Sequence, residues 1–230
     1  MATPIALVSG VTGGIGRALA DGFGAAGYKV TGIDRTEAPA HASIDYVRLD
    51  VTDTAAVAAF GASLDRVDVL INAAGVIRRV EEFEVAVFEQ VVDINLTGTM
   101  RLATACQPAL ARAGGAVINI ASMLSFFGGG LVPGYAASKG GVAQLTKSLA
   151  IAWAKDGIRV NAIAPGWIAT AMTAALREDA ARNRTILERT PMARWGTPDD
   201  LVGPALFLAS EAARFVTGVI LPVDGGYSVV

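Results

Sequence analysis

Short apolar runs alternate along the chain with longer segments whose apolar residues recur three and four positions apart. The short runs predict the strands of a buried parallel sheet, and the longer segments predict amphipathic helices. Predicted strands cover residues 5–8, 28–33, 44–49, 67–71, 116–120, 159–163 and 219–223, and predicted helices cover residues 15–26, 55–64, 88–111 and 135–155. Repeated strand–helix–strand order predicts an α/β fold, a doubly wound parallel sheet of about seven strands with helices on both faces.

No Ser-, Pro- or Gly-rich linker, block of charge or internal repeat divides the chain, so residues 1–230 are predicted to form a single domain. The least regular stretch is residues 167–198, where a helical pattern over residues 171–186 is followed by prolines and a glycine. A segment of this length after a strand is more often functional than a simple connection. We therefore predict that residues 167–198 form a substrate loop or lid.

Composition excludes several classes of function. With 53% hydrophobic and 17% charged residues, the chain is not intrinsically disordered. Its 19 Lys and Arg residues against 21 Asp and Glu residues lack the positive charge of a nucleic-acid-binding protein. One histidine, His41, and one cysteine, Cys106, are too few for a usual zinc site, so no metal is predicted. We expect His41 in an exposed loop and Cys106 buried in a helix.

The longest stretch without acidic or basic residues lies between Arg112 and Lys139 and contains several glycines and Pro133. These residues make it a poor membrane-spanning helix. The first residues show neither a basic region nor a cleavage-like site. Together these features predict a cytoplasmic chain without a membrane partner.

Glycines follow the first predicted strand, in the sequence Ser9-Gly10-Val-Thr-Gly-Gly14-Ile15-Gly16. Glycines at this place let the backbone approach a pyrophosphate, whose charge is stabilised by N–H groups at the start of the next helix. The spacing G-x-x-x-G-x-G differs from the usual G-x-G-x-x-G, and no Gly-Lys-Ser/Thr follows as in a P-loop. The motif predicts a Rossmann-type dinucleotide site, with a glycine-rich turn without a ligand as the alternative.

Polar residues end the next predicted strands, where ligands of doubly wound sheets bind. Asp34 ends the second strand, and a carboxylate there accepts hydrogen bonds from an adenosine ribose and repels a 2′-phosphate, so NAD is predicted over NADP. Arg35 follows directly and would offset part of that repulsion. Two further stretches are placed to contact a cofactor, although both also suit ordinary turns: Asp50-Val51 and Asn72-Ala73-Ala74-Gly75.

Four polar residues are candidates for catalysis. Tyr135 and Lys139 share a helix face, where the lysine charge would favour the phenolate and lower the tyrosine pKa towards neutral pH. Ser122 follows the fifth strand, where its hydroxyl can hydrogen-bond a substrate carbonyl. Asn95 lies in a helical pattern, where asparagine is mildly unfavourable, and can hold a water for proton relay. A solvated helix face and a loop serine are the alternatives.

In order and approximate spacing these motifs resemble the short-chain dehydrogenase/reductase family, classical type, over essentially the whole chain. Two positions depart mildly from the family pattern: Ser9 replaces the usual Thr, and Ala73 replaces the usual second Asn. The resemblance rests on the glycine-rich turn, residues 72–75, Asn95, Ser122, the Tyr135 and Lys139 pair, and Pro165-Gly166.

The resemblance implies an NAD(P)-dependent oxidoreductase that interconverts a secondary alcohol and a ketone by hydride transfer. Tyr135 would exchange a proton with the substrate oxygen, and Ser122 would orient that oxygen. Lys139 would bind the nicotinamide ribose and lower the Tyr135 pKa, while Asn95 would hold the relay water. The cofactor-binding residues implied in this way are Gly10, Gly14, Ile15, Gly16, Asp34, Asp50, Val51, Asn72, Ala73, Gly75, Tyr135, Lys139, Pro165, Gly166, Ile168 and Thr170.

Four loops around the expected pocket resemble those of 2-deoxy-D-gluconate 3-dehydrogenase and gluconate 5-dehydrogenase members of the family: residues 74–79, 120–126, 161–166 and 193–196. This similarity implies a sugar acid or keto-deoxy sugar acid as the substrate. Arg78 and Arg194 are candidates for binding its carboxylate, and Trp195 is a candidate for the pocket wall. Exposed arginines at a loop or subunit contact are the alternative.

Other functions stay open at this point. A 3-oxoacyl-carrier-protein reductase would use the same catalytic residues with NADPH, and apolar residues such as Met123 and Phe126 would suit a cyclic ketone or alcohol. A cofactor-binding regulator without catalysis is disfavoured by the presence of all four catalytic candidates. The resemblance also implies a homotetramer formed through residues 88–111 and 135–155.

Overall fold

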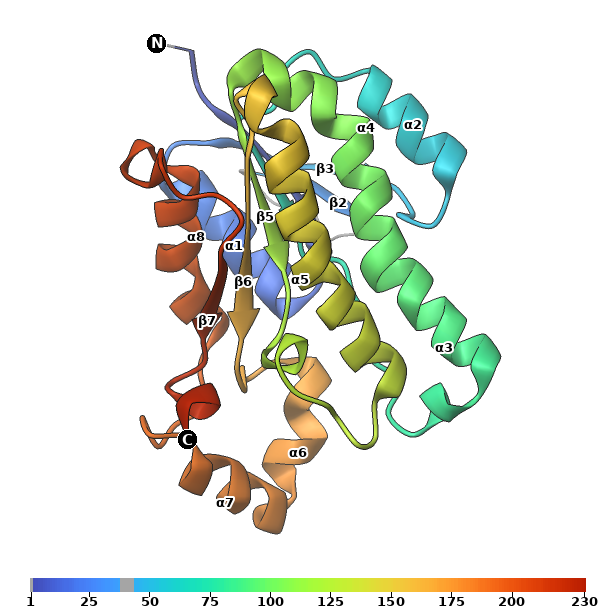
Figure 1. The fold of residues 1–230 in the computed structure, drawn as a ribbon, viewed down its shortest axis with the longest axis vertical. Coiled ribbons are helices and arrows are strands. Elements are labelled where there is room, and N and C mark those ends of the chain that lie inside the picture. Colours follow the sequence, from blue (N-terminus) through green and yellow to red (C-terminus); the bar gives the residue numbers. More distant parts are fainter. Residues whose placement is uncertain (1, 38–43) are drawn as a thin grey trace.

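In the computed structural model, which describes residues 2–37 and 44–230, seven parallel strands form one sheet in the order β3-β2-β1-β4-β5-β6-β7 (Figure 1). This order confirms the doubly wound sheet predicted from the alternating pattern. His41, predicted in an exposed loop, lies outside the described residues. The strands are β1 (Ile5–Ser9), β2 (Lys29–Asp34), β3 (Ile44–Arg48), β4 (Val69–Asn72), β5 (Ala116–Ile120), β6 (Arg159–Pro165) and β7 (Ile220–Val223).

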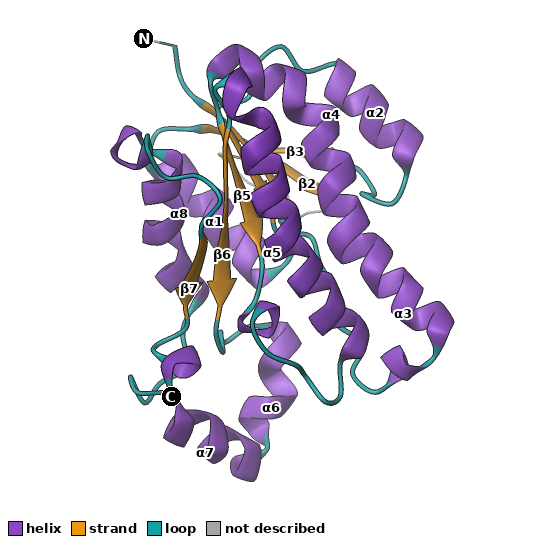
Figure 2. Cartoon of the chain, in the orientation of Figure 1, coloured by secondary structure: helices purple, strands orange, loops and turns teal. Residues whose placement is uncertain are grey.

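Helices cover both faces of the sheet (Figure 2). One face packs against α1 and α8, and the other packs against α2, α4 and α5. Among the described residues, no helix is long and apolar enough to cross a membrane. The helices are α1 (Gly14–Ala25), α2 (Thr54–Ala62), α3 (Val85–Val92), α4 (Gly98–Ala113), α5 (Pro133–Trp153), α6 (Ala174–Glu178), α7 (Ala180–Arg189) and α8 (Val202–Ala209).

The central strand β1 contributes to both cores because successive side chains of a strand point to opposite faces. Leu7 packs with the helices α2, α4 and α5, whereas Ala6 and Val8 pack with α1 and α8. All three side chains are at most 1% exposed. A sheet that is buried on both faces therefore needs continuously apolar strands, which is the pattern seen in the sequence.

Three stretches differ from the predicted elements. A π-helical turn, Asp93–Thr97, separates α3 from α4 within the predicted helix 88–111. The helical pattern over residues 171–186 is divided between α6 and α7, because Asp179 accepts hydrogen bonds from two N–H groups that follow it and so starts a new helix. Helix α8 was not predicted, since its sequence is apolar on nearly all sides and contains Gly and Pro.

The carboxyl ends of the strands share one edge of the sheet, where α6, α7 and the C-terminus also gather (Figure 1). The segment predicted as a loop over residues 167–198 is therefore largely helical and lies at this edge. Ligands of doubly wound sheets bind at this edge.

Candidate active site

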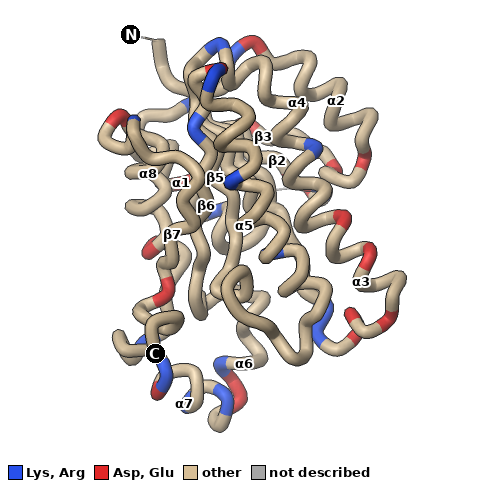
Figure 3. Tube along the Cα trace, viewed as in Figure 1, with Lys and Arg blue, Asp and Glu red and all other residues tan. Residues whose placement is uncertain are grey.

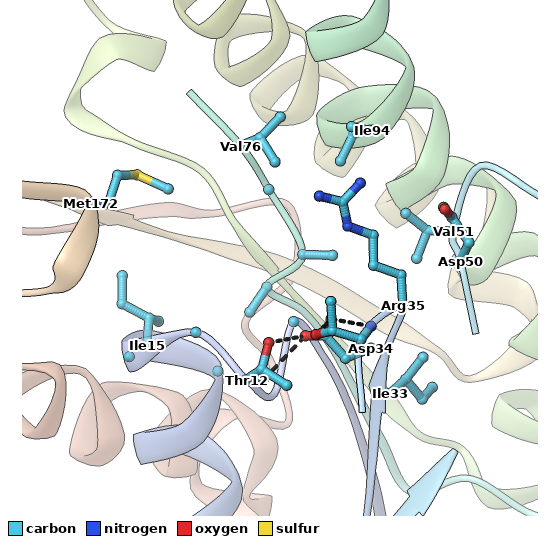
Figure 4. A pocket seen from close by; sticks show the side chains of 18 of the residues that line it. Thr12, Ile15, Ile33, Asp34, Arg35, Asp50, Val51, Val76, Ile94 and Met172 are labelled. Atoms are coloured by element: carbon cyan, nitrogen blue, oxygen red, sulfur yellow. Dashed lines mark hydrogen bonds between the residues drawn. The ribbon is translucent and has the colours of Figure 1, made fainter. Parts of the chain in front are cut away.

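A cavity of about 400 Å³ opens at the carboxyl edge, next to the point where the strand order reverses between β1 and β4 (Figure 4). The ends of β1, β2, β3 and β4 supply one wall, and Met172 lies on another side. This is the place where doubly wound sheets bind nucleotides. The predicted cofactor residues that line it are Gly10, Gly14, Ile15, Gly16, Asp34, Asp50, Val51, Ala73, Gly75 and Thr170.

The glycine-rich turn fits the pyrophosphate of a dinucleotide. Gly10 has a φ of +72°, and a Cβ at this position would lie 2.7 Å from the backbone of Ala73. A Cβ on Gly16 would lie 2.1 Å from the Gly10 carbonyl oxygen, so neither position accommodates a larger residue. Helix α1 starts after Gly13 without a side-chain cap and without an acidic residue in its first turn. Its first N–H groups can therefore bind an anion.

Asp34 ends β2, as predicted, and binds the glycine-rich turn (Figure 4). Its Oδ2 accepts hydrogen bonds from the backbone N and the hydroxyl of Thr12, at 3.2 and 2.7 Å. Its Oδ1 accepts from the backbone N and the hydroxyl of Thr36, at 3.2 and 3.1 Å. A carboxylate has about four acceptor sites, so a ribose hydroxyl must replace or share one of these bonds. The side chain of Arg35 enters the same cavity (Figure 4).

Asp50 lines the cavity just after the end of β3. Its Oδ1 accepts hydrogen bonds from the backbone N and the hydroxyl of Thr52, at 2.9 and 2.8 Å. The backbone hydrogen bond, with the charges of Arg35 and Arg101, lowers the pKa of Asp50 below its usual value. The Asp50 carboxylate is therefore ionised at neutral pH and forms an ordered turn, which is the alternative reading that the sequence left open.

Asn72 starts a buried hydrogen-bond chain beneath the cavity. Its Nδ2 donates to Asn119 Oδ1 at 2.9 Å, and Asn119 Nδ2 donates to the hydroxyl of Thr146 at 2.9 Å. The chain joins β4, β5 and α5. Asn72 Oδ1 is buried and accepts no hydrogen bond within the described residues. An unpaired buried oxygen is unusual, and here it is free to accept a hydrogen bond from a ligand or a water.

Ser122, Tyr135 and Lys139 come together between β5 and α5. The Ser122 side chain forms a hydrogen bond with the half-buried Tyr135 phenol. Lys139 Nζ lies 5.6 Å from the centroid of the Tyr135 ring and donates to the Ile120 carbonyl oxygen at 2.6 Å. A Cβ on Gly75 would lie 3.7 Å from Lys139 Nζ, so the ammonium borders the cavity. The phenol of Tyr135, the hydroxyl of Ser122 and the ammonium of Lys139 thus form one cluster, which is suited to proton exchange with a substrate oxygen.

Burial shifts the pKa values of this group. It lowers the pKa of Lys139 to about 8. Burial also raises the pKa of Tyr135, which the hydrogen bond with Ser122 lowers in part and the negative charge of Glu82 raises further. The net direction is opposite to the predicted lowering by Lys139, because loss of water around the phenolate outweighs the favourable contacts.

Asn95 is fully buried in the π-helical turn Asp93–Thr97, a type of turn that often marks functional sites. Its Oδ1 accepts from the backbone N of Val76 at 2.8 Å. Its Nδ2 donates to the Val76 carbonyl oxygen at 2.9 Å and to the Ser138 hydroxyl at 3.1 Å. The side chain thus fixes the segment after β4 against α5. Its side-chain oxygen and both amide hydrogens are thus engaged within the chain, and its backbone carbonyl oxygen accepts from the hydroxyl of Thr99 at 2.8 Å.

Sequence reasoning missed Glu82, which is only 1% exposed. Its Oε1 accepts from the backbone N of Arg78 at 2.7 Å, and its Oε2 accepts from the backbone N of Tyr135 at 2.8 Å. The neighbouring Glu81 and Glu84 are exposed, so the acidic run reads as an ordinary solvated turn. No local signal marks the middle carboxylate, because its burial depends on residues that are distant in sequence.

The structure separates the two arginine candidates. Arg194 forms a fork with Asp200, with Nη1 2.7 Å from Oδ2 and Nη2 2.9 Å from Oδ1. Arg78 is half-buried, and its guanidinium forms no ion pair with an acidic residue of the described chain. Trp195 lies edge-on to Trp167, with ring centroids 5.9 Å apart. Arg194 thus lines the second cavity with its partner Asp200, whereas Arg78 has no acidic partner among the described residues.

The remaining predicted cofactor residues lie at the end of β6. Pro165 ends this strand, and Gly166 follows it at the carboxyl edge. Ile168 borders a second cavity of about 210 Å³ beside the first. The Thr170 side chain packs against the glycine-rich turn, since a Cβ on Gly14 would lie 3.1 Å from Thr170 Cγ2. The segment after β6 therefore reaches the wall of the cofactor cavity.

Comparisons with known proteins agree with this geometry. Residues 10–228 match the family model described as enoyl-(acyl carrier protein) reductase. The 2-dehydro-3-deoxy-D-gluconate 5-dehydrogenases of Pseudoalteromonas atlantica and Bacillus subtilis are 42% and 43% identical, over 97% and 96% of this chain and 95% and 93% of their own lengths. The structure of a gluconate 5-dehydrogenase from Burkholderia cenocepacia in complex with NADP and tartrate is 36% identical, with a TM-score of 0.93, and covers 100% of this chain and 97% of that one.

These matches span nearly the full length of the chain and of its relatives, and they confirm the family predicted from the motifs. Structures of similar chains contain bound NADP, in agreement with the shape of the glycine-rich turn. The protein belongs to the short-chain dehydrogenase/reductase family and is an NAD(P)-binding oxidoreductase that acts on CH–OH groups.

Proposed function

We propose that the protein interconverts a secondary alcohol and a ketone on a sugar acid or a keto-deoxy sugar acid. One observation carries the substrate class: the backbone N–H groups of Arg78 and Tyr135 bind the same carboxylate, that of Glu82, at 2.7 and 2.8 Å. The backbone of Arg78, which has no acidic partner among the described residues, therefore lies close to the backbone of Tyr135, the candidate proton donor. The sugar-acid dehydrogenases among the relatives support this substrate class.

The bound cofactor supplies or accepts the hydride. In oxidation Tyr135 takes the proton of the substrate hydroxyl, and in reduction it returns a proton to the carbonyl oxygen. Ser122, which contacts the phenol, orients the substrate oxygen by a hydrogen bond. Lys139 brings a positive charge to the phenol and the nicotinamide ribose, and Asn95 fixes the backbone beside them. Residues 167–198 form the lid of this site within a single domain.

Arg78 binds the substrate carboxylate in this proposal, since a guanidinium matches a carboxylate with two parallel hydrogen bonds. Arg194 is engaged by Asp200 and therefore stabilises the lid. Arg78→Ala should raise KM for a keto-sugar acid by about 10- to 100-fold, the range expected for hydrogen bonds to a charged group. The same substitution should change KM for a neutral ketone only slightly. Equal effects on both substrates would contradict this role. Arg194→Ala releases the lid from Asp200 and should affect both substrates alike.

For the cofactor we propose that NAD is preferred and NADP is used less efficiently. The carboxylate of Asp34 in the cavity disfavours a 2′-phosphate, and Arg35 beside it offsets only part of this repulsion (Figure 4). The ratio of kcat/KM for NAD to that for NADP should exceed one, and Asp34→Ala should lower it. A wild-type ratio below one would contradict the preference.

We also propose a cytoplasmic homotetramer. Neither α4 nor α5 contains an acidic residue, and basic residues are sparse on both (Figure 3). Met100 on α4 is 39% exposed and Ile151 on α5 is 81% exposed. Apolar residues on these two helices are suited to a subunit contact. Light scattering should give the mass of four chains, and Ile151→Asp should lower that mass. A wild-type mass of one chain would contradict the proposal.

A further inference from the structure

The short 3₁₀ turn Glu81–Phe83 contains one glutamate that differs from its neighbours in burial. Glu82 is 1% exposed, whereas Glu81 and Glu84 are exposed. A buried carboxylate is unfavourable unless hydrogen bonds compensate for the lost water. In Glu82 each oxygen accepts one backbone N–H group, one from Arg78 and one from Tyr135. The carboxylate thus bridges two segments that are more than fifty residues apart in the sequence.

The two bridged segments are held at further points. Val80 has a φ of +70°, which is unusual for a β-branched residue, and its N–H donates to the Leu131 carbonyl oxygen at 2.8 Å. At the start of α5, a Cβ on Gly134 would lie 3.3 Å from Glu82 Oε2, so the turn lies directly against the helix. The loop of Arg78 and the first turn of α5 therefore have little room to move relative to each other.

We propose that Glu82 is a positioning residue that fixes the loop of Arg78 and the helix of Tyr135 at one spacing. A sugar acid bound through its carboxylate would then present its reacting oxygen to the phenol. The contact with Tyr135 does not depend on the substrate, whereas the part that concerns Arg78 rests on the function proposed above. Small errors in such a spacing reduce rates strongly, because reacting groups must be aligned before the reaction.

Glu82 also acts on Tyr135 through its charge. Among the described residues, the titratable groups that face the phenol are Lys139 on the same helix and Glu82 on the adjacent turn, and Ser122 adds a hydrogen bond. The negative charge of Glu82 raises the pKa of Tyr135, so its removal should lower that pKa. A residue that only stabilised the helix would leave this pKa unchanged, and a pH profile therefore separates the two roles.

Two substitutions separate charge from reach. Glu82→Gln keeps the size but removes the charge and, because an amide nitrogen cannot accept a hydrogen bond, one of the two backbone contacts. Glu82→Asp keeps the charge but shortens the side chain. Glu81→Gln removes a charge from the exposed neighbour and is the matched control. For each variant, kcat and KM are measured from neutral to alkaline pH, with a sugar acid and with a neutral secondary alcohol. Thermal unfolding shows which variants are folded.

In the pH profile of kcat for alcohol oxidation, kcat rises with pH as the phenol of Tyr135 ionises. We expect Glu82→Gln to move this rising limb to lower pH, because the phenolate forms more readily. Glu82→Asp should leave this limb in place and lower kcat/KM by about tenfold or more for the sugar acid, and by less for the neutral alcohol. If Glu82→Gln does not fold, the comparison of the two substrates with Glu82→Asp still decides the outcome. Profiles and constants equal to those of Glu81→Gln would overturn the proposal.

Failure of the proposed function gives a different result. If sugar acids are not substrates, the wild-type protein does not oxidise them, while the shift of the limb in Glu82→Gln still occurs with the alcohol that it does oxidise. If Glu82 is not a positioning residue, the wild-type protein oxidises sugar acids and the Glu82 variants behave as the control.

Discussion

Replacement of Lys139 by Met should stabilise the protein while it removes the activity. Burial lowers the pKa of Lys139 from 10.5 to about 8, so the folded chain holds an ammonium in a place that disfavours charge. At about 1.4 kcal/mol per pKa unit, this shift costs about 3 kcal/mol at pH 7. The variant also loses the hydrogen bond to the Ile120 carbonyl oxygen, a loss of about 1 kcal/mol. The net gain is about 2 kcal/mol.

The gain should depend on pH in a defined direction. Below the folded pKa of about 8, the wild-type chain carries the full cost of the buried charge. Above it, the folded lysine is neutral and the unfolded lysine still binds a proton, so the wild-type stability rises with pH until the unfolded pKa of 10.5 is reached. At about pH 9.5 the cost has fallen to about 1 kcal/mol, and the advantage of the variant nearly disappears.

Thermal unfolding of the protein without cofactor measures this effect. A gain of about 2 kcal/mol at pH 7 should raise Tm by about 4 to 8 °C in a chain of this size. Lys147→Met, on the exposed side of α5, is the control and should show no gain that depends on pH. The reasoning is refuted if Lys139→Met is less stable than wild type at pH 7, or if its gain is the same at both pH values.

Further substitutions test the remaining contacts. Tyr135→Phe should lower kcat by at least about 10²-fold, with the cofactor Kd nearly unchanged in a fluorescence titration, and a near wild-type kcat would exclude acid–base catalysis by the phenol. Gly16→Ala puts a Cβ 2.1 Å from the Gly10 carbonyl oxygen and should abolish cofactor binding, whereas Gly203→Ala meets no atom within 4 Å and should not. Thr146→Val removes the acceptor of Asn119 and should lower the free energy of unfolding by about 1–3 kcal/mol in urea; an unchanged value would mean that the buried chain is not stabilising.

The fold could be predicted because its signal is local. Strands buried on both faces are continuously apolar, and the glycines after β1 are required by a positive φ and by a close approach of backbone atoms. Helix α8 escaped prediction because its sequence is apolar on nearly all sides and shows no periodicity. The π-helical turn around Asn95 escaped it because helix-length periodicity does not distinguish α from π turns.

The sequence named candidate residues that the structure brings together, but it did not reveal their contacts. Tyr135 and Lys139 were found from their spacing and Ser122 from its place after a strand, yet the raised pKa of Tyr135 follows from burial, which the sequence does not reveal. Glu82 lies among exposed acidic residues, and only its contacts with two distant backbone N–H groups distinguish it. Pairing of Arg194 with Asp200 is likewise a matter of tertiary structure, and it is what separates Arg194 from Arg78.

The most direct test of the central claim follows the absorbance of the reduced nicotinamide with purified protein. NAD and NADP are compared across deoxy and keto sugar acids, polyols, cyclic alcohols, their ketones and acyl thioesters. We predict turnover of sugar acids, with NAD more efficient than NADP. Turnover of acyl thioesters with NADPH alone, and none of sugar acids, would contradict both the substrate class and the cofactor preference assigned from Arg78 and Asp34.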